Sequence, residues 1–259
     1  MKNAATLCFF FCCVQFSLAQ IQSGEIIYKV RPPKSLEVYT DTSKMETSSR
    51  VKMFFVRRYR NIKNTAQHLR FSLLFNKNES RFQKEPGMAN DNGMDIEKAA
   101  RATGVYGLYY VNNEENLSLN QYSSPLLGKL ILVSSDLDSP DWTIKKDRRN
   151  IAGFSCQKAE AVIHHDPEKN IKLVITAWFA PDLPFQFGPL GHGGLPGMIL
   201  GLEKRHFYFY ADKIDLRKTK QKIKRPTKGK KITREKLDSI QEEHRKIMQK
   251  RFEEMKKRQ

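Results

Sequence analysis

The amino-acid sequence predicts a mainly β fold: a curved antiparallel sheet, similar to an open half-barrel, followed by a C-terminal α-helix. Three observations lead to this prediction. Short runs rich in Val, Ile, Phe and Tyr recur as far as residue 212, which is typical of strands. Several runs alternate in polarity, and no stretch resembles a repeated β-α-β unit. Residues 233–259 have instead the three- and four-residue spacing of an amphipathic helix.

Nine runs have the composition and length of strands. They are Glu25–Val30, Val51–Tyr59, Leu69–Phe75, Val105–Val111, Lys129–Ser134, Trp142–Lys146, Lys158–Ile163, Ile171–Phe179 and His206–Tyr210. In Ile171–Phe179 the odd-numbered positions are all apolar, and the even-numbered positions include Val174 and Trp178. Both faces of that strand therefore have apolar groups, and we expect it to lie inside the sheet. Residues 76–104 are polar and contain glycine. We expect a loop at Met88–Asp95 and one or two helical turns at Asp95–Ala102.

Composition divides the chain into four segments. We expect a cleavable signal peptide at 1–20, a β-rich domain at 21–212, a basic edge strand and linker at 213–232, and a charged amphipathic helix at 233–259. In the linker, lysines alternate from Lys218 to Lys224, a pattern that protects edge strands from aggregation. Thr233 is the expected N-cap residue of the helix.

The first twenty residues have the pattern of an export signal. Lys2 precedes an apolar run, and Ser17-Leu18-Ala19 places small residues where a signal peptidase cleaves. Cys8 and Cys12 follow large apolar residues, so we expect no lipid anchor. The sequence thus predicts an exported protein, periplasmic or associated with the outer envelope. Cleavage leaves Cys156 without a disulfide partner in the chain. We expect it to be a small buried residue, a nucleophile or one half of an intermolecular bridge.

Basic residues are concentrated near the C-terminus. The formal net charge is +18, and residues 213–259 account for +12 of it. A basic tail usually implies an anionic partner. Because export makes nucleic acid an unsuitable partner, we expect an anionic membrane surface, or else a solvated tail. The helix is expected to pack weakly on the domain, or to bind a partner or a membrane surface.

The segment from Phe179 to Gly201 is dense in proline and glycine, which excludes regular secondary structure over most of its length. Leu195-Pro196-Gly197-Met198 has the residues of a type II turn, with Pro196 at the second position and Gly197 at the third. We expect a structured apolar loop at one end of the curved sheet. It either fills that end as packing or lines a pocket.

The hexapeptide Gly194-Leu195-Pro196-Gly197-Met198-Ile199 resembles Gly-Leu-Pro-Gly-Leu-Ile, which gives the GLPGLI family its name. Further similar residues extend the resemblance over roughly residues 105–259. They are Trp142-x-Ile144, Ile151-x-Gly153-Phe154-x-Cys156-x-Lys158-Ala159, Ala177-Trp178-Phe179, Pro184, Gly188-Pro189 and Ile232-Thr233-Arg234-Glu235. The chain departs from the family at Met198, where the family has Leu, and at His192. The resemblance implies an exported envelope protein of unknown function and assigns no catalytic residues.

We expect the binding region around this loop and the strand before it. Its candidate residues are Trp178, Phe179, Pro184, Gly188, Pro189, Gly194, Leu195, Pro196, Gly197, Met198 and Ile199. They predict a non-enzymatic protein that holds an apolar or lipid ligand, or another envelope protein, in a groove beside Trp178 and Leu195. A role in envelope assembly is a further hypothesis.

The alternative is a hydrolase that uses Cys156 or a site centred on His192, because His192-Gly193-Gly194 is similar to an oxyanion loop. The Gly-x-Ser-x-Gly pentapeptide that accompanies such a loop does not occur in the sequence. Neither does a P-loop, a dinucleotide-binding fingerprint or a Cys-x-x-Cys pair. We therefore expect no catalytic residues, no metal and no cofactor.

Overall fold

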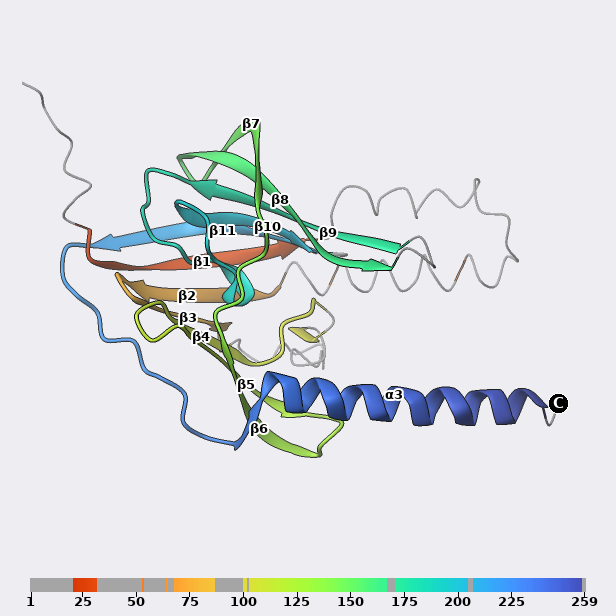
Figure 1. Cartoon of the computed structure of the whole chain (residues 1–259). Coiled ribbons are helices and arrows are strands. Elements are labelled where there is room, and N and C mark those ends of the chain that lie inside the picture. The colour runs from red at the N-terminus through yellow and green to blue at the C-terminus, as the bar shows by residue number, and fades with distance from the viewer. Residues whose placement is uncertain are drawn as a thin grey trace, which may run out of the picture.

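The computed structural model describes residues 21–31, 53, 64, 68–86, 100, 101, 103–166, 171–204 and 207–257 of the 259-residue chain. Within these described residues, twelve strands form a single open sheet, and a long helix follows them (Figure 1). The predicted fold class, mainly β with a curved open sheet and a C-terminal α-helix, is confirmed. The expected signal peptide at 1–20 and all but Met53 of the expected strand Val51–Tyr59 lie outside the described residues.

The strands follow one another across the sheet mostly as antiparallel neighbours. They are β1 (Ser23–Arg31), β2 (Arg70–Asn76), β3 (Glu79–Lys84), β4 (Leu108–Asn112), β5 (Leu117–Ser124), β6 (Lys129–Asp136), β7 (Thr143–Ile151), β8 (Phe154–Asp166), β9 (Ile171–Ala180), β10 (Met198–Lys204), β11 (Phe207–Arg217) and β12 (Lys230–Thr233). Their spatial order is β12-β6-β5-β4-β3-β2-β1-β11-β10-β9-β8-β7. The β12–β6 pair is parallel. The long-range pair β1–β11 joins the two halves of the sheet.

Hairpin turns use residues that suit a tight reversal. Ala152 and Gly153 have φ of 50° and 88°, as a two-residue hairpin loop between β7 and β8 requires. Asn150 Oδ1 accepts a hydrogen bond from Gly153 N (3.1 Å). In the β2–β3 and β4–β5 turns, the side-chain oxygens of Asn76 and Asn112 accept hydrogen bonds from backbone amides two and three residues on. These local bonds help to set the register of the hairpins.

Polarity alternation predicts some strands and misses others. In β9, Ile175, Ala177 and Phe179 are buried in the core, and β9 lies inside the sheet between β10 and β8, as expected. The polar strands β3 and β5 were not among the predicted runs. Phe82 is the one apolar residue of β3, so the strand lacks the apolar alternation on which the prediction depends. On its outer face, Arg81 Nη1 donates a hydrogen bond to Lys224 O (3.4 Å).

The sheet curls around residues 181–197, which connect β9 to β10. Phe185 of this connection packs against Phe75 of β2, with ring centroids 4.7 Å apart. The short 3-10 helix η4 (Pro189–Gly191) lies against β3 and β4. In the other half of the sheet, Met198 and Ile199 of β10 donate backbone hydrogen bonds to Leu183 O and Phe187 O of the connection (both 2.9 Å). Both halves therefore contact this segment, and we call the face of the sheet that it covers the inner face. The main hydrophobic core lies between that face and the connection.

On the outer side of the sheet, residues 218–229 form an extended segment that we call the strap, which runs from β11 past the ends of β1 and β2 and along β3–β6 to β12 (Figure 1). Ile223 of the strap packs with Tyr110 and Leu119 in a second apolar cluster. The prediction of an edge strand at Lys218–Lys224 is therefore wrong. These residues pack over the sheet instead of pairing at its edge, because Ile223 is buried there. The edge strand is β12, and β11 runs five residues beyond the expected boundary at 212.

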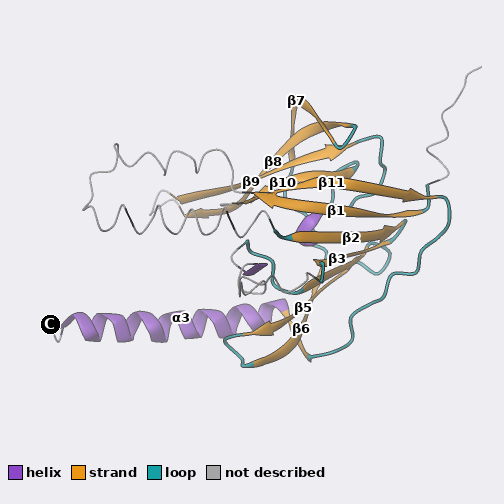
Figure 2. Cartoon of the chain, turned by 180° about the vertical axis from the view of Figure 1, so that it is seen from behind, coloured by secondary structure: helices purple, strands orange, loops and turns teal. Residues whose placement is uncertain are grey.

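The helix α3 (Arg234–Lys257) begins where expected and extends beyond the sheet (Figure 2). Thr233 Oγ1 accepts a hydrogen bond from the backbone amide three residues on (3.3 Å), which confirms Thr233 as the N-cap. Leu237 is 1% exposed and packs on β6, whereas Ile247 and Met255 are 45% and 59% exposed. Among the described residues, no helix combines the length and the apolarity needed to cross a bilayer.

Candidate functional site

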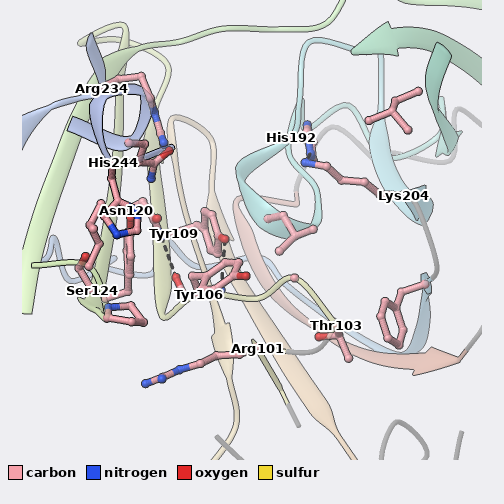
Figure 3. A pocket seen from close by; sticks show the side chains of 18 residues that line it. Arg101, Thr103, Tyr106, Tyr109, Asn120, Ser124, His192, Lys204, Arg234 and His244 are labelled. Carbon is pink, nitrogen blue, oxygen red and sulfur yellow. Dashed lines mark hydrogen bonds between the residues drawn. The ribbon is translucent and has the colours of Figure 1, made fainter. Parts of the chain in front are cut away.

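A cleft of about 1400 Å³ lies on the inner side of the sheet (Figure 3). One wall comes from β4, β5 and the first three turns of α3, and the other comes from η4 and the end of β10. The turn before β4, at residues 103–106, adds to the lining. Four segments that are distant in the sequence therefore meet at one site, because the sheet curls and brings its two halves towards each other.

Cationic side chains surround this cleft. Arg101, Lys204 and Arg234 line it, together with His192 and His244. None of the described residues that line the cleft is an aspartate or a glutamate. Positively charged lining residues favour an anionic group on a ligand, because they offset the cost of removing that group from water.

Three tyrosines give the cleft an aromatic wall. The rings of Tyr106 and Tyr122 lie with centroids 6.0 Å apart, and Tyr109 OH accepts a hydrogen bond from Tyr106 N (3.3 Å). Asn120 Nδ2 donates to the carbonyl oxygens of Tyr106 and Leu108, which holds the turn against β5. Burial raises the pKa of Tyr109 to about 12 and raises the pKa of Tyr122. Both hydroxyls therefore stay protonated at neutral pH and can donate hydrogen bonds.

His192 lines the cleft beside a cation. Its Nε2 lies 3.3 Å from Lys204 Nζ, so a neutral imidazole nitrogen can accept a hydrogen bond from the ammonium group. Burial, and then the positive charge of Lys204, lower the pKa of His192 below its usual range. A histidine that resists protonation is a weak general base. The environment of His192 therefore favours a binding role over the hydrolytic role considered from the sequence.

Cys156 lies in the core rather than at a reactive surface. Its side chain is 0% exposed, and its Sγ lies 3.6 Å from the carbonyl oxygen of Phe154. Burial raises the pKa of the thiol to about 11, although the nearby Arg149 acts in the opposite direction. The thiolate is the nucleophilic form of cysteine, and this environment disfavours it at neutral pH. The structure thus favours the first interpretation of Cys156, a small buried residue.

The hexapeptide Gly194–Ile199 belongs to the packing between β9 and β10. Leu195, Met198 and Ile199 are at most 1% exposed. A Cβ on Gly197 would overlap the carbonyl oxygen of Ala180, so the close approach of these two backbones requires glycine. The predicted type II turn is wrong, because Gly197 has a φ of 156° where that turn needs about 80°. Met198 N, which would donate to Leu195 O in such a turn, donates to Leu183 O instead (2.9 Å).

The other candidate residues divide between the two faces of the sheet. Phe179, Gly188 and Pro189 are buried on the inner side, and Pro184 and Pro196 are exposed. Trp178 lies on the outer face, where the guanidinium carbon of Arg149 is 3.9 Å from a ring centroid. Trp178 and Leu195 are therefore on different faces, and the structure does not bring them together around one groove. Of residues 181–197, which form the loop between β9 and β10, only Leu190 and His192 line the cleft.

Sequence reasoning missed the tyrosines and most of the cations of the cleft. Tyr106, Tyr109 and Tyr122 lie in strands and turns where aromatic residues are expected for packing alone. Lys204 and Arg234 lie about 30 residues apart in stretches that contain many other basic residues. No local motif connects these positions, so their convergence could be found only from the way the sheet curls.

Comparison with known proteins gives a short family match. Residues 165–201, which contain β9 and the hexapeptide, match a family described as "Protein of unknown function (Porph_ging)". The match spans the segment on which the GLPGLI resemblance depends most, and the GLPGLI name itself stays a prediction. No curated protein matches the chain.

Two solved structures of PNGF-II, in space groups C2 and P21, are similar in fold to the chain. Each has a TM-score of 0.48 and 12% sequence identity, and the similarity covers 85% of this chain. The chain spans about a third of those proteins, 32% and 33% of their lengths. At this similarity the comparison gives no information on function.

Proposed function

We propose that the chain is an exported, non-enzymatic binding protein of the cell envelope, and that its cleft holds an anionic ligand with an apolar or aromatic portion. The observation behind this proposal is the composition of the cleft wall. Arg101, Lys204 and Arg234 line it together with three tyrosines, and no carboxylate is among the described lining residues. The export pattern at 1–20 and the resemblance of Gly194–Ile199 support the envelope setting.

The size of the cleft fits a ligand larger than a simple ion. Small-molecule sites are commonly about 300–1000 Å³, and this cleft has about 1400 Å³. The tyrosine rings offer apolar surface, and their protonated hydroxyls offer hydrogen-bond donors. An acidic lipid or another anionic amphiphile combines the two chemistries that the wall provides. The proposed ligand class narrows the apolar or lipid ligand expected from the sequence to one that also has an anionic group.

A fluorescent fatty acid tests this proposal. The purified chain should bind cis-parinaric acid, measured by fluorescence titration, more tightly than its uncharged methyl ester. The double variant Lys204→Met, Arg234→Met should bind the acid about tenfold or more weakly, because it removes two charges from the wall. The control Lys222→Met, Lys224→Met removes two charges from the strap and should leave binding unchanged. Equal binding of acid and ester, or an unaffected cleft variant, would contradict the proposal.

A further inference from the structure

A row of lysines lies on the strap, on the opposite face of the sheet from the cleft. Lys218, Lys220, Lys222, Lys224 and Lys228 are all exposed, and the strap contains no Asp or Glu. From the sequence this stretch was expected to be an edge strand or a solvated tail. In the structure it is instead fixed to the domain along most of its length.

The strap is anchored through its main chain. Four of its carbonyl oxygens accept hydrogen bonds from side chains of β1, β2, β3 and β5. The pairs are Ser23 Oγ with Thr219 O (2.7 Å), Asn76 Nδ2 with Gln221 O (3.0 Å), Arg81 Nη1 with Lys224 O (3.4 Å) and Gln121 Nε2 with Lys228 O (2.6 Å). Because the sheet binds the strap by its backbone, the lysine ammonium groups are not needed for anchoring.

Burial of Ile223 directs the lysines on either side of it outwards. Ile223 is 4% exposed in the outer apolar cluster. In an extended chain, alternate residues point to opposite sides and recur about every 6–7 Å. With Ile223 facing the sheet, Lys222 and Lys224 on either side of it face solvent. The result is a row of positive charges, one residue wide, along a fixed line.

The shape and chemistry of this row favour one kind of partner. The strap crosses the convex outer face of a curled sheet, so a flat membrane contacts only part of the row, whereas a flexible chain can follow all of it. Residues 217–232 contain no aromatic side chain, and proteins that bind single-stranded nucleic acid normally stack bases on aromatic rings. A repeating acidic sugar chain needs only regularly spaced cations.

The helix α3 does not extend this surface. Ile131 and Val133 of β6 contact Leu237 of α3, whereas Leu132 between them belongs to the cluster that contains Ile223. Since neighbouring residues of a strand point to opposite faces, the strap and α3 lie on opposite sides of β6. The basic C-terminal region therefore consists of two separate surfaces, and the strap is the one without interspersed acidic residues.

We propose that the strap binds a linear acidic polysaccharide along its row of lysines. This site is independent of the ligand proposed for the cleft. Counterions released from the polymer favour binding, so affinity falls as salt concentration rises, and each lysine that contacts the polymer adds to the slope. A fixed row also costs less entropy on binding than a mobile tail with the same charges.

Heparin fragments of defined length serve as the probe, with titration calorimetry on the full chain. The variant Lys218→Gln, Lys220→Gln, Lys222→Gln, Lys224→Gln should bind at least about tenfold more weakly and with a smaller salt slope. The matched control Lys236→Gln, Lys246→Gln, Lys250→Gln, Arg251→Gln removes four exposed charges from α3 and should stay within about twofold of the parent. Equal losses in both variants would show a net-charge effect and overturn the proposal.

Two further measurements separate the row from its alternatives. Ile223→Ser keeps every charge but loosens the strap, and it should weaken heparin binding while the circular dichroism of the sheet is unchanged. Unaltered binding by this variant would mean that a fixed line is not required, which contradicts the proposal. Vesicles containing phosphatidylglycerol and single-stranded DNA complete the comparison. If the strap variant loses more affinity for either of these than for heparin, the assignment to a polysaccharide is wrong.

Discussion

Single residues of the Gly194–Ile199 motif are explained by packing rather than by chemistry. Gly197 approaches the Ala180 carbonyl so closely that a side chain has no space, and Leu195 fills the core below it. The sequence could indicate a tight turn from proline and glycine. It could not indicate that the motif bonds to the distant Leu183 and Phe187 carbonyls, because those bonds depend on the path of the whole connection.

Replacing Gly197 should therefore destabilise the fold. Gly197→Ala forces its Cβ against backbone atoms, and we expect a loss of about 2 kcal/mol or more in unfolding free energy. Gly128→Ala is a suitable control, because Gly128 also has a positive φ (62°) but a Cβ there meets nothing within 4 Å. The control should lose about 1 kcal/mol. Urea denaturation measures both variants, and equal losses would contradict the packing explanation.

Cys156 should make stability fall at high pH. Burial raises the pKa of its thiol to about 11, whereas the pKa of a cysteine thiol in an unfolded chain is about 8.5. The unfolded chain therefore loses this proton first as the pH rises. Between these two values the unfolding free energy should fall by up to about 1.4 kcal/mol per pH unit.

The variant Cys156→Ala isolates this effect from that of the buried tyrosines, which titrate in both proteins at higher pH. Its unfolding free energy should decline less between pH 8.5 and about 10 than that of the parent chain. Denaturant titrations at a series of pH values provide the measurement. Parallel curves for the two proteins would show that the Cys156 thiol ionises equally easily in the folded state, and the inert role assigned to it would be wrong.

Among the elements, the strands rich in apolar residues were predictable, including β1, β2, β4 and β6 beside the strap, and the polar strands β3 and β5 were not. β9 shows alternating burial of Ile175, Ala177 and Phe179, as its sequence indicates. β3 and β5 contain few apolar residues, because part of their outer face is covered by polar contacts to the strap. Arg81 and Gln121 of these strands donate to strap carbonyls. A pattern that scores only apolar residues misses a strand stabilised in this way.

The helix α3 should contribute to stability through its first two turns alone. Leu237 is buried against β6, whereas Ile247 and Met255 are exposed. Leu237→Ala should cost about 2–3 kcal/mol of unfolding free energy. Truncation after His244 keeps the cleft residues of the helix and should change stability by less than about 0.5 kcal/mol. Thermal and urea unfolding compare the two; a large loss on truncation would mean that the exposed turns pack on the domain.

At the scale of the molecule, the curvature of the sheet explains why the site was not predictable. The fold class follows from local patterns, and local patterns give the strands their faces. The cleft depends instead on which strands become neighbours of the connection at 181–197. Tyr109 faces the inner side and Tyr110 the outer side of β4, so adjacent tyrosines belong to two different surfaces. Their separate roles become visible only when both halves of the sheet are in place.

The two proposed binding surfaces should act independently, because the sheet separates them. The cleft lies on the inner face, and the strap crosses the outer face. Unit charges in water interact weakly beyond a Debye length, about 8 Å at physiological salt. The quadruple strap variant should thus bind cis-parinaric acid within about twofold of the parent, and Lys204→Met, Arg234→Met should leave heparin affinity equally unchanged.

Combining the two sets of substitutions completes the test. If the surfaces are independent, the combined variant should lose as much heparin affinity as the quadruple strap variant. It should also lose as much affinity for cis-parinaric acid as Lys204→Met, Arg234→Met. Fluorescence titration and calorimetry at 0.15 M salt measure these losses. Saturation with heparin should also leave the affinity for the fatty acid unchanged, since linkage between sites is reciprocal. A shift of tenfold or more in either direction would show that one ligand contacts both surfaces or that the sheet changes shape on binding. In that case the strap and the cleft form a single functional unit, and they are not two independent binding surfaces.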